Sequence, residues 1–269
     1  MDNQIIERSF MSEAYSFQEA VDAFGRVIQN IHNAFKAETF LDWPTVLLST
    51  LLETTAMSLY RLLPKEDSGK SRGIVDRRSI ASLIRNLVDT HDTLDLLCDL
   101  HQSEEKFNLH RDIIGFYLSG KLHETYNKGD VSNFSNRMTK IRDWYWKRIC
   151  EGLPDEAERK RLKSGRSLFY TTRKERLKKS CGEDASFVGE VLSDLSSYIH
   201  SVPPSLWMKT LEEAFADDTQ TRGMLSVWLR IANFYFAKSI DIVLTSVDYK
   251  NIEGVLKRYI ERNRVVFEH

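Results

Sequence analysis

The chain has 269 residues, which is enough for one large domain or two small ones with a sizeable core. Charged residues make up 29% and the formal net charge is -1, so overall charge selects no partner. The three cysteines are too few and too widely spaced for a disulfide framework or a zinc motif. These totals predict a cytoplasmic protein with reduced thiols and without a metal or cofactor.

Helices are predicted along the whole chain. The sequence has only five Pro and 12 Gly, and it shows no strand-like alternation and no internal repeat. Apolar residues at three- and four-residue steps predict helices over residues 12–37, 42–63, 76–100, 103–126, 130 or 132–152, 184–198, 208–215, 220–246 and 250–263. The apolar runs 46–63 and 224–247 carry charges at mid-span, which favours buried helices over membrane spans. We therefore expect an all-α bundle of about nine to ten helices in one domain over residues 1–269.

A strongly basic segment lies between residues 159 and 179. It holds ten Lys and Arg against one acidic residue, a net charge of +9, so the rest of the chain carries -10. Two hypotheses stay open. The region near 152–183 is either a solvated helical connection or a contact for RNA, in which Phe169 and Tyr170 stack on unpaired bases. The residues expected to hold the RNA backbone are Arg159, Lys160, Arg161, Lys163, Arg166, Arg173 and Lys174.

The segment 76–100 carries the sharpest chemical motif. Its apolar stripe is typical of a core-facing helix, and Asp76 is expected to cap its start. Beside this stripe lie Arg85, Asn86 and, five residues further on, His91. Cleavage of RNA by transesterification needs a proton-transfer group and a cation for the phosphate, and His and Arg supply both without a metal.

This motif resembles that of the HEPN superfamily, whose all-helical members include many toxin and defence ribonucleases. The resemblance implies that Arg85 clamps phosphate, Asn86 positions it and His91 is the acid–base. It also implies that two protomers pair so that their motifs share one cleft, which makes a homodimer an expectation. Arg85, Asp89 and the later Tyr198-Ile-His200 element are similar to a group of uncharacterised bacterial helical proteins, which implies a cluster of Arg85, Asp89 and His200.

The geometry of one helix favours an alternative function. His91 falls about 120° around a straight helix from Arg85 and roughly 9 Å along it, so the two do not face one phosphate. Arg85 lies one turn from Asp89, which predicts an ion pair. The alternative is a non-catalytic helical scaffold that binds another protein. The ribonuclease hypothesis requires Arg85 and His91 to be exposed in a cleft, whereas the scaffold hypothesis has His91 buried and Arg85 paired to a carboxylate.

Overall fold

The structure is a computed structural model that describes residues 3–34, 42–65, 75–100, 103–126, 132–163, 168–169, 171–200, 216–247, 249–250 and 252–266. The chain divides into two compact units. Unit 1 comprises residues 1–97 and 177–269, and unit 2 comprises residues 98–176. The expectation of one domain over 1–269 with a connection near 152–183 stays a prediction. The basic segment itself contributes to both units.

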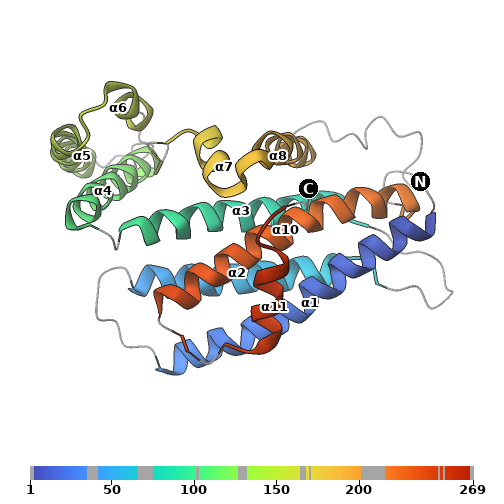
Figure 1. The fold of residues 1–269 in the computed structure, drawn as a ribbon. Coiled ribbons are helices and arrows are strands. Elements are labelled where there is room, and N and C mark those ends of the chain that lie inside the picture. The colour runs from blue at the N-terminus through green and yellow to red at the C-terminus, as the bar shows by residue number, and fades with distance from the viewer. Residues whose placement is uncertain are drawn as a thin grey trace. The chain divides into compact units, whose positions relative to one another are not determined.

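The described residues form helices and contain no strand, which confirms the all-α prediction (Figure 1). Unit 1 holds α1 (Asn3–Ala34), α2 (Asp42–Leu62), most of α3 (Arg77–Leu100), the end of α7 (Arg173–Cys181), a short 3-10 helix (Gly182–Asp184), α8 (Ala185–His200), α10 (Thr219–Ser246) and α11 (Gly254–Arg262). Unit 2 holds α4 (Glu104–Tyr126), α5 (Ser132–Gly152), α6 (Glu156–Leu162) and the start of α7. The helix predicted over 208–215 lies outside the described residues. None of the helices in the described ranges combines the length and apolar composition that a membrane crossing requires.

The first helix begins at Asn3, nine residues earlier than the predicted start at residue 12. Phe10 is fully buried and continues the apolar stripe toward the N-terminus. Glu7 lies beside it and pairs with the buried guanidinium of Arg222 on α10. These contacts with a segment more than two hundred residues away stabilise the extra turns, and local periodicity does not report them.

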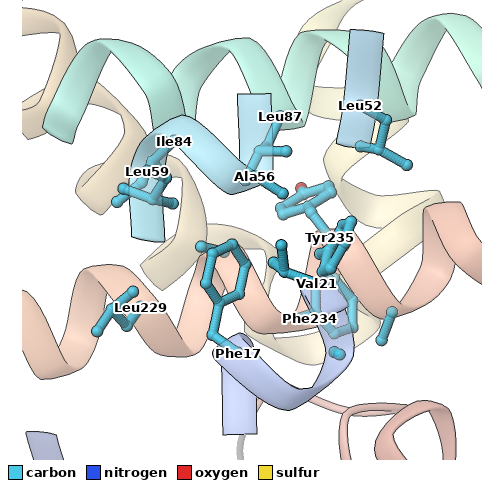
Figure 2. Packing of buried hydrophobic residues seen from close by; sticks show 14 of the residues in the cluster. Phe17, Val21, Leu52, Ala56, Leu59, Ile84, Leu87, Leu229, Phe234 and Tyr235 are labelled. Carbon is cyan, nitrogen blue, oxygen red and sulfur yellow. The ribbon is translucent and has the colours of Figure 1, made fainter. Parts of the chain in front are cut away.

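The core of unit 1 gathers around α10. Figure 2 shows side chains from α1, α2, α3 and α10 pointing into one shared interior. Phe236 on α10 packs against α1, with its ring centroid 5.3 Å from that of Phe17 and 5.6 Å from that of Phe24. Fully buried members of this cluster from α2 and α3 include Leu52, Ala56, Leu59, Ile84 and Leu87. Because the four helices pack around one apolar interior, this packing also fixes where their polar residues lie.

Side chains cap the starts of several helices. Asp76 accepts a hydrogen bond from the backbone N–H of Ser79 at 3.0 Å, which confirms its predicted role as the cap of α3. Thr172 and Glu175 form a reciprocal capping box at the start of α7. The basic segment therefore contains two capped helices, α6 and α7, in its described part.

Unit 2 is held together by close packing of α4 against α5. Gly115 on α4 lets the ring of Tyr145 approach so closely that a Cβ built there would lie 2.3 Å from the ring. A partly buried ion pair adjoins this contact, with Arg148 Nε 2.8 Å from the buried Asp112 Oδ2. The small core of this unit consists of Ile113, Phe116, Ile149, Leu153 and Leu162.

We expect Gly115→Ala to destabilise unit 2 by about 1–3 kcal/mol, because the added methyl group overlaps the ring of Tyr145. The control is Gly189→Ala in α8, where the nearest atom to an added Cβ is 3.5 Å away. That change should stabilise its helix by up to about 1 kcal/mol through helix propensity. Urea unfolding of both variants and the parent measures the difference. Stabilisation by both substitutions would contradict the close approach of α4 and α5.

Candidate functional site

The three residues of the candidate ribonuclease motif lie on different sides of α3. Arg85 points toward α8, where its Nη1 donates to the Leu192 carbonyl at 3.5 Å, and its Nε lies 3.6 Å from Asp89 Oδ1. Asn86 is exposed and lines a groove shared with α2. His91 is buried, with 2% of its surface exposed. Within one chain the structure therefore does not bring Arg85, Asn86 and His91 to a common cleft.

The ring of His91 is held by α10. Its Nδ1 lies 3.3 Å from Ser239 Oγ, and its edge packs on Tyr235 with centroids 5.0 Å apart. The Ser239 hydroxyl donates to the Tyr235 carbonyl at 2.7 Å, so it accepts from the ring rather than donating to it. This assigns the proton of a neutral His91 to Nδ1 and leaves Nε2 as the basic nitrogen.

The surroundings of His91 disfavour its charged form. Burial lowers its pKa from 6.5 to about 3, and the positive charges of Lys238 and Lys179 act in the same direction. A general acid–base works best with a pKa near the ambient pH. His91 is thus a neutral imidazole at pH 7, which favours a structural role over proton transfer to and from RNA.

His91 also lines a polar pocket of about 270 Å³, the Lys238 pocket, where α3, α7 and α10 meet. Two of the lining cations have partners, since Lys238 Nζ donates to the Ser180 carbonyl at 2.6 Å and Lys179 Nζ lies 2.7 Å from Asp95 Oδ2. The full lining is His91, Asp95, Lys179, Ser180, Lys238, Asp241 and Ile242.

The Lys238 pocket gathers groups whose pKa values depart from their ordinary values. Burial lowers the pKa of Lys238, and burial raises the pKa of the nearby Cys181 thiol, which lies 3.3 Å from the Tyr235 hydroxyl. Such groups beside a pocket mark a candidate functional site. Sequence reasoning missed it, although Lys238 and Asp241 interrupt the apolar run 224–247 and were the available signal.

A second, more apolar groove of about 360 Å³ runs between α2 and α3. Leu48 and Leu51 line its α2 side, and Asn86 and Asp89 line its α3 side. Leu51 has 52% of its surface exposed, and Leu47, one turn before it, has 60% exposed. The groove thus combines one exposed leucine, with a second a turn away, and polar residues from α3.

The arginines and lysines of the basic segment differ in their contacts and exposure. Arg159 donates to the Cys150 carbonyl at 3.5 Å, and Arg161 lies 3.6 Å from Glu175. Arg176 stacks over Phe169 at 4.0 Å, so this aromatic face is covered by the protein itself. Of the described residues in the candidate set, Lys160, Lys163 and Lys174 are exposed, while Arg173 is half-buried.

Some residues of the predicted sites lie outside the described part of the chain. These are Arg166 and Tyr170 of the basic segment and the side chain of His200, the last residue of α8. Of the expected cluster, the structure brings Arg85 and Asp89 together. No three His, Cys, Asp or Glu side chains in the described ranges gather closely enough to bind a metal ion.

Comparison of the chain with protein-family models, with curated proteins and with solved structures found no match to any of them.

We expect His91 to make the stability of unit 1 depend on pH. Its pKa is about 3 when folded and near 6.5 when unfolded, so the unfolded chain binds the extra proton between these values. The His91 contribution is therefore fully present above pH 6.5 and is lost as the pH falls toward 3, by up to about 1.4 kcal/mol per pH unit.

The measurement compares urea unfolding of the parent and of His91→Gln at several pH values from 7.5 to 4. The difference in unfolding free energy between them should shrink as the pH falls, because Gln binds no proton. A difference that stays constant across this range would show that His91 is not buried as a neutral ring.

Proposed function

We propose that the chain is a non-catalytic helical scaffold that binds another protein. The proposal is supported by the burial and the partners of the motif residues on α3. His91 is buried and bonded to Ser239, while Arg85 is paired with Asp89 and turned toward α8. Both features match the expectations that distinguish a scaffold from a ribonuclease. A homodimer that assembles a shared cleft would have to withdraw His91 from the core, at the expense of its packing.

The surface best suited to a protein partner is the groove between α2 and α3. Exposed leucines beside an apolar groove favour binding when a partner removes them from water. Leu47 and Leu51 lie one helical turn apart, and Leu51 itself lines the groove. Asp89, Asn86 and Thr93 from α3 supply hydrogen-bonding groups at its margin.

The test uses purified tagged chain to recover binding proteins from an extract of its source cells. We expect Leu51→Asp to abolish recovery of the partner, because it places a charge in an apolar contact. The matched control is Leu118→Asp on α4, since Leu118 has the same exposed fraction of 52%. An identical set of recovered proteins for the parent and both variants would contradict the proposal.

RNA binding by unit 2 is the second candidate function. Residues 98–176 contain 17 Lys and Arg against 12 Asp and Glu, a net charge of +5, whereas the rest of the chain carries -6. The exposed lysines Lys160, Lys163 and Lys174 support this candidate. Exposed lysines suit contacts to the phosphate backbone of RNA, which do not depend on the base sequence.

If unit 2 binds RNA, the triple variant Lys160→Gln, Lys163→Gln and Lys174→Gln should bind a single-stranded RNA more weakly. The slope of log affinity against log salt should fall in magnitude by about 2, as expected for three lost phosphate contacts. The control variant changes Lys106, Lys140 and Lys147, which are exposed lysines of α4 and α5, to Gln.

If the two triple variants weaken RNA binding equally, the effect comes from net charge alone, which would contradict a specific basic surface. The same samples, incubated with labelled RNA and EDTA, also test the ribonuclease hypothesis. Cleavage by the parent that is lost in both Arg85→Ala and His91→Ala would overturn the scaffold proposal and restore the HEPN-like site.

A further inference from the structure

We propose that the Lys238 pocket binds a small aldehyde or ketone, which condenses with the side-chain amine of Lys238 to form an imine. This inference is independent of the scaffold proposal and concerns a binding step rather than turnover. The volume of about 270 Å³ lies just below the range of about 300–1,000 Å³ found for pockets that hold drug-sized ligands. A compound of a few carbon and oxygen atoms therefore fits it.

The position of the Lys238 amine is defined by its contacts. Nζ donates to the Ser180 carbonyl at 2.6 Å and lies 4.8 Å from the centre of the Phe234 ring. The side chain is half-buried, yet it lines the pocket together with the neutral ring of His91. An amine held in one place beside an open volume meets the geometric requirement for a nucleophile.

The charges around Lys238 act in both directions. The negative charges of Cys181 in its thiolate form, Asp95 and Asp241 favour the ammonium form, whereas Lys179 disfavours it. Loss of solvent is the largest effect, and the pKa of Lys238 is lowered overall. A larger share of this amine is therefore unprotonated at pH 7 than of an exposed lysine, and only the unprotonated amine attacks a carbonyl carbon.

The condensation balances with the amine, the carbonyl compound and solvent. The nitrogen lone pair of Lys238 forms a bond to the carbonyl carbon, and the carbonyl oxygen becomes a hydroxyl by taking a proton. The nitrogen then loses its protons, the hydroxyl leaves as water, and a C=N bond remains. The two protons that the nitrogen loses are the two that the departing oxygen gains, and solvent at the open pocket relays them. No oxidation or reduction takes place.

A purely structural role for Lys238 is the competing explanation. Its hydrogen bond to Ser180 links α10 to α7, and such a link alone requires no carbonyl ligand. The two explanations differ in the reactivity of the amine. A structural ammonium reacts with aldehydes more slowly than exposed lysines do, whereas a nucleophilic amine reacts faster.

The test incubates the folded full chain at pH 7 with glycolaldehyde and sodium cyanoborohydride, which reduces the imine to a stable secondary amine. Peptide mass spectrometry then gives the labelling rate at each lysine. We expect Lys238 to be labelled several-fold faster than the exposed Lys160 and Lys163, because a larger share of its amine is unprotonated. In urea-unfolded protein this advantage should disappear.

Matched variants on α7 test the contribution of the neighbouring cation. Lys179→Met should slow the labelling of Lys238 several-fold, because it removes a positive charge that favours the neutral amine and leaves Asp95 to favour the ammonium. Lys178→Met changes the adjacent exposed lysine and should leave the rate unchanged. Labelling of Lys238 in the folded parent at or below the rate of Lys160 would overturn the proposal, and so would equal slowing by both variants.

Discussion

The burial of α10 on every side is the constraint on which unit 1 depends. Residues 231–237 are seven consecutive buried positions, which is two full turns without a solvent-facing side. Each large apolar side chain kept from water there contributes about 1.5–3 kcal/mol. Burial on all sides requires neighbours on all sides, and α1, α2, α3 and α11 supply buried residues to the same core.

A helix with no exposed side must also satisfy its polar groups internally. Asn233 is fully buried; its amide donates to Glu13 at 2.7 Å and its side-chain oxygen accepts from the Tyr259 hydroxyl at 2.7 Å. Ser239 does the same for His91. An unsatisfied buried polar group costs about 1–3 kcal/mol, so these bonds specify which faces of α1, α3 and α11 meet α10. The His91 ring is thus explained by the requirements of α10, without reference to RNA.

The all-α class and several helix limits were predictable from the sequence because they depend on local properties. Spacing of apolar residues and the capping chemistry of Asp76 act within a few residues. The early start of α1 was missed because it depends on Arg222, which is remote in sequence. The candidate site could be predicted only in part. His91 was singled out as a member of an apolar stripe, but its partner Ser239 and the pocket beyond it belong to segments more than eighty residues away.

Arg230 and Lys238 both interrupt the apolar surface of α10, and their contacts differ in kind. Arg230 donates to the carbonyls of Val266 and Val265 and to the Asn263 side chain, which distributes its charge over the C-terminal turn. Lys238 donates to one carbonyl within the described part of the chain, that of Ser180, and lines an open pocket. A cation that serves only to join helices is stabilised by added acceptors, as Arg230 is. Lys238 borders a pocket that can hold a ligand, whereas Arg230 is surrounded by protein groups that accept its hydrogen bonds. Because of this difference along one helix, we assign a chemical role to Lys238 and a structural role to Arg230.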